Sequence, residues 1–149
     1  MEVATAVDGI TEQIIGGAIV VHQSLGPGLL ESAYESCLAF ELNERGLNVE
    51  RQRPFPLIYK SMRIDCAYRI DLLVQDSVIV EIKALEQVLP VHQAQLLSYL
   101  RLASLPVGLL INFHVASLRN GIRRVVNSFP PSLRPPRSSA SSALKGNTS

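Results

Sequence analysis

Apolar residues recur at helical spacing over residues 8–25. Their intervals of three and four residues form one apolar stripe, the pattern of an amphipathic helix that begins near Asp8 or Thr11. Gly16 and Gly17 interrupt this helix, and because each glycine costs about 1 kcal/mol in a helix interior, we expect them to permit close approach of another backbone. The stripe consists of Ile10, Ile14, Ala18, Val21 and Leu25.

A second helix follows a break at Gly26-Pro27-Gly28. Residues 29–46 return to helical spacing, and Gly46 suits the left-handed position that ends a helix. We expect the two helices to contribute to a common core. The stripe of the second helix consists of Leu30, Ala33, Cys37, Leu38 and Leu42.

From residue 49 to residue 83 the pattern changes to short alternating or apolar runs. Turn residues at 60–62 and 75–77 divide this segment into a meander of strands. A third helix is predicted at 90–104, with Pro90 in its first turn and Pro106 beyond its end. The apolar run that follows predicts a strand buried on both faces, and GIRRVVN predicts a last short strand or helix.

The composition indicates one globular domain with a tail. The chain has 149 residues, of which 47% are hydrophobic and 18% charged, enough apolar side chains for a core. We therefore predict a flexible N-terminus at 1–8, a single domain at 9–127 and a disordered, basic, proline- and serine-rich tail at 128–149.

The formal net charge of +1 conceals an uneven distribution. Residues 1–86 contain all 13 acidic residues and 7 basic ones, whereas residues 87–149 contain 7 basic residues and no acid, so the balances are −6 and +7. This asymmetry is compatible with a cation-binding half and a phosphate-attracting half, and equally with solubility alone.

The chain shows no sign of export or of membrane insertion. Cys37 and Cys66 lack CxxC spacing, which argues against a zinc site or disulfide scaffold and fits a reducing compartment. The N-terminus carries acids where a signal peptide needs basic residues, so we expect a cytoplasmic location. Residues 102–118 are uncharged, but Pro106 and Asn112 favour a helix end and a buried strand over a membrane span.

Three charged residues lie on two neighbouring predicted strands. Glu81 and Lys83 are two residues apart, so their side chains project from the same face of one strand. A hairpin brings Asp71, at the start of the preceding strand, beside them. Charges among apolar strands are costly to bury unless they pair or bind a metal, so this convergence predicts a functional site. The alternative is a surface salt bridge on a hairpin.

Asp71 and Glu81 offer the hard oxygen ligands that Mg²⁺ or Mn²⁺ prefers. Lys83 is then suited to orient or deprotonate the attacking water, or to stabilise charge that develops on a phosphate. Glu31, which directly follows the Gly-Pro-Gly break, is a candidate third carboxylate.

Two residues of the third predicted helix extend this group. Gln95 and Tyr99 are four residues apart and share one helix face, just after the strand that carries Lys83. Their alternative roles are core packing for Tyr99 and helix capping or solvent exposure for Gln95. We interpret Tyr34 as a structural residue, packed one turn into the second helix. His22 is the histidine best placed to border the site, although a lone histidine is more often a packing residue.

These residues resemble known motifs. Asp71 with Glu81-x-Lys83 resembles the D…(D/E)xK signature of the PD-(D/E)xK nuclease superfamily. Gln95-Leu-Leu-Ser-Tyr99 resembles the QxxxY motif of its RecB-type exonuclease branch. Gly28-Leu-Leu-Glu31-Ser-Ala-Tyr34 matches the motif that names the GxxExxY family, and this likeness covers roughly residues 9–127.

The resemblance implies a fold, a reaction and a role for each residue. The fold is α/β of a mixed α+β type, a restriction-endonuclease-like core in which a central mixed β-sheet is flanked by helices. The reaction is Mg²⁺- or Mn²⁺-dependent hydrolysis of nucleic acid, with DNA favoured. Ile70 stands where the superfamily motif has a proline, a loose element of that motif. The implied roles are metal binding by Glu31, Asp71 and Glu81, assistance to the attacking water by Lys83, and positioning of the phosphate or the lysine by Gln95 and Tyr99.

Basic residues near the end of the domain are candidate nucleic-acid contacts. Arg119, Arg123 and Arg124 are suited to contact phosphates, and the tail adds non-specific attraction through Arg134, Arg137 and Lys145. A solvated basic end is an equal alternative.

Two hypotheses remain open at this point. The first is an active metal-dependent nuclease, and the second is a catalytically inactive nuclease-fold module that binds nucleic acid or a protein. Because a chain this small has little surface for selecting a substrate, we expect a homodimer or a partner subunit to provide that surface. A small-molecule enzyme finds no support, because the chain lacks a glycine-rich phosphate loop and a nucleophile motif.

Overall fold

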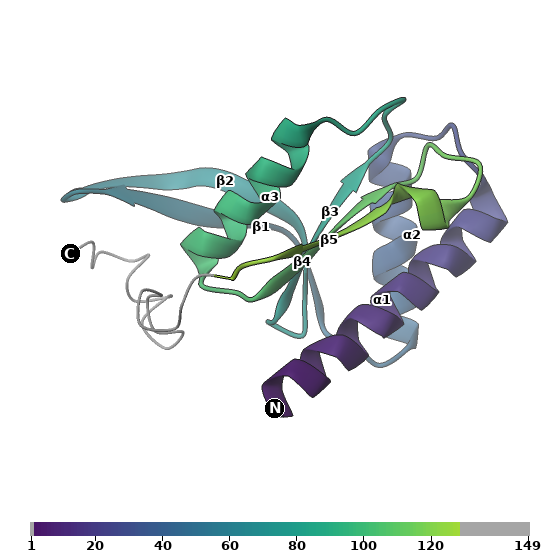
Figure 1. The fold of residues 1–149 in the computed structure, drawn as a ribbon, viewed down its shortest axis with the longest axis horizontal. Coiled ribbons are helices and arrows are strands. Elements are labelled where there is room, and N and C mark those ends of the chain that lie inside the picture. The colour runs from purple at the N-terminus through teal and green to yellow at the C-terminus, as the bar shows by residue number, and fades with distance from the viewer. Residues whose placement is uncertain (1, 129–149) are drawn as a thin grey trace.

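The computed structural model of the protein describes residues 2–128 (Figure 1). The predicted tail lies outside the described residues from position 129 onward, together with its three basic residues. The elements are α1 (Glu2–Leu25), α2 (Glu31–Glu44), β1 (Val49–Tyr59), β2 (Met62–Val74), β3 (Val78–Lys83), α3 (Pro90–Ala103), β4 (Val107–Asn112), a 3₁₀ helix η1 (Leu118–Gly121) and β5 (Ile122–Val126).

The five strands form one sheet in the order β1-β2-β3-β4-β5. The first three strands are the predicted antiparallel meander. β4 is parallel to β3, and α3 makes the crossover that a parallel pair requires. β5 returns antiparallel to β4. The sheet is therefore mixed, as the family resemblance implied.

Helices cover both faces of this sheet. α1 and α2 pack on one face, where their apolar side chains meet alternate residues of β2, β3 and β4. α3 packs on the other face, where Leu96 and Leu100 meet Ile79 and Leu110. Every residue of β4 is buried, which confirms the predicted two-sided strand. The architecture agrees with a restriction-endonuclease-like core.

The two glycines of α1 lie where α2 packs against it. A Cβ atom on Gly17 would stand 2.9 Å from Cδ2 of Leu42, and one on Gly16 would stand 3.0 Å from a guanidinium nitrogen of Arg45. The predicted close approach is present, although side chains of α2 rather than its backbone occupy the space.

α1 begins earlier than the sequence predicted, at Glu2 rather than near Asp8 or Thr11. Val7 continues the apolar stripe and is buried in the core. Asp8 accepts an ion-paired hydrogen bond from Arg124 of β5 at 2.9 Å. These contacts extend the packed part of the helix toward its N-terminus.

The predicted stripe of α2 is wrong in part. Leu30 and Cys37 are exposed, because the helix begins only at Glu31 and turns a different face inward. That face includes Tyr34, whose ring stacks on Phe113 with centroids 4.5 Å apart. Contacts with distant strands therefore decided the orientation of this helix. Its buried residues are Tyr34, Glu35, Leu38, Ala39 and Leu42.

None of the helices formed by residues 2–128 is long and apolar enough to cross a membrane. The uncharged stretch 102–118 forms the end of α3, the strand β4 and the loop after it, which confirms the predicted helix end and buried strand.

Candidate active site

Asp71 and Glu81 meet at the point where β2 and β3 stop pairing. The ladder between the two strands runs from Val74–Val78 to Leu72–Val80 and ends there. The next pair in this register would be Asp71 and Glu81. Here hydrogen bonds from backbone N–H groups to the two carboxylates take the place of the backbone–backbone bonds of the ladder. The Asp71 N–H donates to Oε2 of Glu81 at 2.9 Å, and the Ile82 N–H donates to Oδ2 of Asp71 at 2.8 Å.

This arrangement places two acidic groups together in a buried position. Glu81 is only 5% exposed. Burial first, and then the neighbouring Asp71 charge, raise the pKa of Glu81 from 4.5 to about 8, against the opposing effects of the Asp71 N–H and of Lys83. Two carboxylates that repel each other in a poorly solvated place are a site where a cation is favourable.

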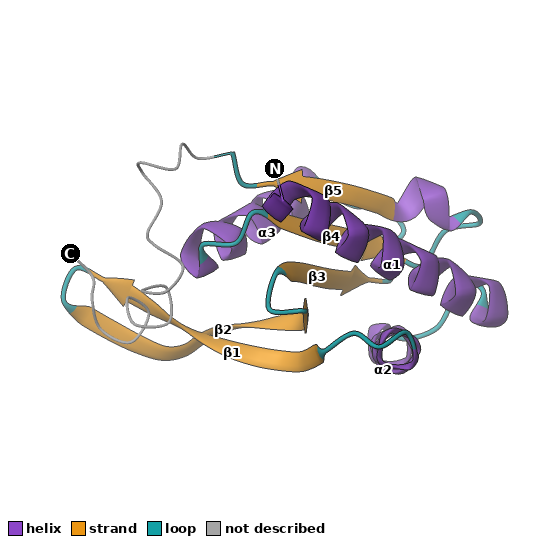
Figure 2. Ribbon diagram, turned by 90° about the horizontal axis from the view of Figure 1, so that it is seen from below, coloured by secondary structure: helices purple, strands orange, loops and turns teal. Residues whose placement is uncertain are grey.

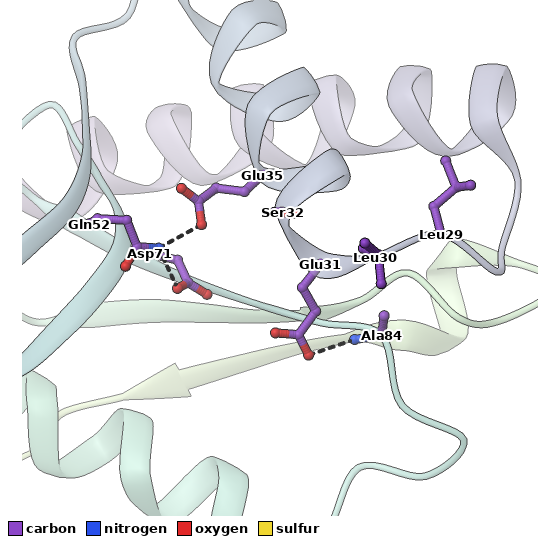
Figure 3. A pocket seen from close by; sticks show the side chains of 8 residues that line it. All are labelled: Leu29, Leu30, Glu31, Ser32, Glu35, Gln52, Asp71 and Ala84. Atoms are coloured by element: carbon purple, nitrogen blue, oxygen red, sulfur yellow. Dashed lines mark hydrogen bonds between the residues drawn. The ribbon is translucent and has the colours of Figure 1, made fainter.

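Gln52 connects this acid pair to α2. In the register of β1 and β2, Arg51 pairs with Leu72 and Arg53 with Ile70, so Gln52 stands opposite Asp71. Its Nε2 donates to Oδ1 of Asp71 at 3.1 Å and to Oε1 of Glu35 at 2.7 Å (Figure 3). The backbone of Gln52 has φ +50°, a left-handed conformation that is strained for a residue with a side chain.

Glu35 is a buried carboxylate whose two oxygens both have partners. Besides the bond from Gln52 to Oε1, Nε of Arg51 donates to Oε2 at 3.2 Å. Arg51 also donates to Oγ of Ser36 at 2.8 Å. α2 is thereby tied to β1, and Gln52 is held in place against Asp71.

Glu31 faces the same pocket as Asp71. Its Oε2 accepts a hydrogen bond from the Ala84 N–H at 3.2 Å, one residue beyond Lys83 (Figure 3). The pocket has a volume of about 560 Å³ and opens between the start of α2, Asp71 of β2 and the residue after the end of β3, Ala84. It is lined by Leu29, Leu30, Glu31, Ser32, Glu35, Gln52, Asp71 and Ala84.

The structure brings Asp71 and Glu81 together but does not gather all three predicted metal ligands. Within residues 2–128, no group of three His, Cys, Asp or Glu side chains is arranged to hold a metal ion. Asp71 and Glu81 fit a hard divalent cation by the chemistry of their oxygens and by their mutual repulsion. Glu31 shares the pocket with Asp71, while its carboxylate is bonded to the Ala84 amide.

Tyr99 of α3 lies close to the acid pair. Burial raises the pKa of the Tyr99 hydroxyl, and the charges of Glu81 and Asp71 raise it further. Its ring stacks on Tyr68 with centroids 4.5 Å apart, and Tyr68 stacks in turn on Phe55 at 5.5 Å. The charges of both acids therefore act on Tyr99, while its ring packs in the aromatic stack.

Lys83 and Gln95 have more open surroundings. Lys83 is half-buried on β3, and its positive charge lowers the pKa of Glu81. Gln95 is exposed, and no hydrogen bond of its side chain occurs within the described part of the chain. Both residues are available to a ligand that enters from solvent.

Tyr34 has the structural role that the sequence predicted. Its hydroxyl donates to the Gly26 carbonyl at 2.6 Å and accepts from the Leu29 N–H at 3.0 Å. Gly28, between them, has φ +104°, a conformation open to glycine. These bonds close the loop that delivers Glu31 to the pocket.

The histidine and the three arginines that the sequence singled out are not among the residues that line the pocket. His22 is buried against Phe113, and its Nε2 donates to the Val115 carbonyl at 2.8 Å, so it acts as a packing residue. Arg123 donates to the Asn120 carbonyl at 3.0 Å, and Arg124 is paired with Asp8. Arg119 is exposed on η1.

Sequence reasoning missed Gln52 and the role of Glu35. The spacing places Glu35 one helical turn after Glu31 on the same face, but it gives no sign of the bonds from Gln52 and Arg51 that Glu35 accepts. No sequence signal identified Gln52, since its position depends on a left-handed backbone in the middle of a strand.

One comparison with known proteins agrees with this geometry. A family model described as the PD-(D/E)XK nuclease superfamily matches residues 8–125. Searches of curated proteins and of solved structures returned no match.

Proposed function

The chain belongs to the PD-(D/E)XK nuclease superfamily, and from this premise we propose that it is a divalent-metal-dependent nuclease that hydrolyses phosphodiester bonds in DNA. The observation that carries the proposal is the meeting of Asp71 and Glu81 at the end of the β2–β3 ladder. Lys83 lies two residues along the same strand from Glu81. The charged residues of the family signature are thus present on neighbouring strands.

Each residue has a distinct task in this proposal. Asp71 and Glu81 hold a divalent cation, with Glu31 as a third carboxylate from the other side of the pocket. When bound, Mg²⁺ or Mn²⁺ supplies Lewis-acid polarisation of the scissile phosphate and favours ionisation of water. Lys83 orients the attacking water, accepts its proton or stabilises charge on the phosphate.

The α3 residues position the reacting groups. The hydroxyl of Tyr99 lies within the electrostatic influence of both acids, and in this proposal it donates to a carboxylate or to a phosphate oxygen. Gln95 lies one turn earlier on the same face and reaches toward solvent. This pair supports membership of the QxxxY branch. The Gly28–Tyr34 segment, with Tyr34 closing the loop before Glu31, supports membership of the GxxExxY group.

The proposal includes a location and partners. The exposed thiols of Cys37 and Cys66 fit a reducing compartment such as the cytoplasm. DNA is preferred over RNA as the substrate. A second copy of the chain or a partner subunit would add the surface that chooses the substrate.

The test is a cleavage assay with the purified chain. Linear, nicked and single-stranded DNA and RNA are incubated with Mg²⁺ or Mn²⁺, and the wild type is compared with Asp71→Asn and Lys83→Ala. We expect cleavage by the wild type and a loss of at least about a hundredfold in both variants.

A matched control is Glu44→Gln, which changes an exposed carboxylate at the far end of α2. Its activity should equal that of the wild type. Equal activity or equal inactivity in wild type, Asp71→Asn and Lys83→Ala contradicts the proposal. Inactivity together with metal-independent DNA binding would support the alternative of a binding module.

A further inference from the structure

The β1–β2 hairpin continues well beyond the candidate site as a two-stranded ribbon. β2 pairs with β3 only through Leu72, Leu73 and Val74, so residues 53–70 pair only with one another. Figures 1 and 2 show this ribbon projecting past both helical layers. Apart from Phe55, Tyr68 and Ile70 at its base, the ribbon adds nothing to the two buried clusters. Core stability therefore does not explain its length.

The ribbon is positively charged, in contrast to the acidic site at its base. Residues 53–70 contain four basic residues, Arg53, Lys60, Arg63 and Arg69, against one acid, Asp65. Arg53 pairs with Glu50 and Asp76, and Arg63 pairs with Asp65. Exposed ion pairs of this kind contribute little to stability, so they can exchange for a phosphate. The ribbon is thus complementary to a polyanion.

The tip of the ribbon also exposes large apolar side chains. Tyr59, Met62 and Ile64 are exposed by 59, 54 and 41%. The ammonium group of Lys60 lies over the Tyr59 ring, 5.5 Å from its centroid. A tip that combines basic and apolar groups is suited to contact both the phosphates and the groove of a duplex.

The outer edge of the ribbon disfavours a protein partner that adds a strand. β1 is the edge strand of the sheet, and Pro54 and Pro56 interrupt its row of N–H donors. Proline is tolerated in an edge strand where the missing N–H would face outward. Such prolines protect an edge from pairing with another chain, which leaves the faces and the tip of the ribbon as contact surfaces.

We propose that the β1–β2 ribbon is a DNA-binding arm that lies against a duplex beside the cleavage site. This inference rests on the proposed function for the nature of the ligand. A two-stranded β-ribbon fits the major groove of B-DNA. Because Gln52 and Asp71 stand where the ribbon begins, the arm and the acid pair form one continuous track.

The length of the ribbon sets the size of the contact. From Gln52 to Tyr59, at about 3.4 Å per residue, the ribbon reaches about 24 Å. At about 3.4 Å per nucleotide along each strand, this corresponds to about seven base pairs. The arm therefore contacts DNA about seven base pairs away from the phosphate at the acid pair.

The test measures DNA binding without catalysis. Fluorescence anisotropy of a labelled 24-base-pair duplex is recorded with the full chain in EDTA, over a range of salt concentrations. For Lys60→Ala/Arg63→Ala, we expect at least about tenfold weaker binding at low salt and a slope of log affinity against log salt that is shallower by about two. The matched variant Arg45→Ala/Arg101→Ala also removes two positive charges, but away from the ribbon, and should retain the wild-type slope.

A second variant separates charge from apolar contact. Tyr59→Ser/Met62→Ser removes exposed apolar surface at the tip and should weaken binding without changing the salt slope, because no charge is lost. Circular dichroism checks that the variants fold, which is expected because these side chains are exposed.

Three results overturn the inference. The first is wild-type affinity in the ribbon variants, and the second is an absence of duplex binding by the wild type in EDTA. The third is a changed oligomeric state in size-exclusion chromatography with unchanged DNA binding, which would identify the ribbon as a protein contact. Failure of the proposed function appears differently, as a lack of metal-dependent cleavage while the ribbon variants still lose DNA affinity.

Discussion

The backbone N–H of Asp71 donates to the carboxylate of Glu81, at the place where these two residues would otherwise have formed the next pair of the β2–β3 ladder. A side chain thus replaces a backbone carbonyl as the acceptor. The amide is satisfied, and β2 is free to leave β3 and form the projecting ribbon with β1. The same exchange collects two carboxylates at one point.

The raised pKa of Glu81 predicts a pH-dependent stability in the absence of metal. Between about pH 4.5 and 8 the folded protein retains a proton that the unfolded chain releases. The stabilising contribution of the Glu81 carboxyl group is therefore complete below pH 4.5 and is lost as the pH rises to 8. Thermal melts in EDTA measure this loss. From pH 5 to 8.5 the melting temperature of the wild type should fall at least about 5 °C further than that of Glu81→Gln.

The control for this measurement is Glu44→Gln, which should follow the wild-type pH profile because Glu44 is exposed. Parallel profiles for wild type and Glu81→Gln would contradict a raised pKa of the buried Glu81. Mn²⁺ should raise the melting temperature of the wild type but not that of Asp71→Asn, since the ion binds only the folded site.

The left-handed backbone at Gln52 predicts that glycine and alanine substitutions lower activity equally but differ in their effect on stability. Gln52→Gly and Gln52→Ala both remove the amide that orients Asp71, and each should lower cleavage about tenfold or more. Glycine accepts φ +50° at little cost, so Gln52→Gly should be more stable than Gln52→Ala by about 1 kcal/mol. Urea unfolding measures the difference, and equal stability of the two variants would argue against strain at this residue.

Glu31 and Glu35 should respond differently to the same substitution. Glu31 is exposed, so Glu31→Gln should change the unfolding free energy by less than about 0.5 kcal/mol while raising the Mn²⁺ concentration needed for cleavage about tenfold or more. Glu35 is buried and paired with Arg51, so Glu35→Gln should destabilise the fold by about 1–2 kcal/mol. An unchanged metal dependence in Glu31→Gln would exclude Glu31 as a ligand.

Tyr34→Phe isolates the hydroxyl that closes the Gly26–Leu29 loop. The ring remains stacked on Phe113, but the Gly26 carbonyl and the Leu29 N–H lose their partner. We expect a loss of about 1–3 kcal/mol in urea unfolding and a smaller loss of activity through displacement of Glu31. Tyr59→Phe, an exposed tyrosine on the ribbon, serves as the matched control and should leave stability unchanged.

The sequence by itself determined the order of the elements and two of the acids. Alternating and apolar runs are local properties, so the meander, the buried strand β4 and the crossover helix α3 were all predictable. Asp71 and Glu81 were predictable as neighbours because a short turn joins their strands.

Only the tertiary structure decided which other residues lie beside Asp71 and Glu81. The face that α2 buries depends on Phe113, far along the chain, and on β1, and this choice buries Glu35 while leaving Leu30 exposed. Gln52 reaches Asp71 from a left-handed backbone position between two paired residues of β1, Arg51 and Arg53. Local periodicity does not encode such contacts, because their free energy comes from groups that meet only after the sheet has formed.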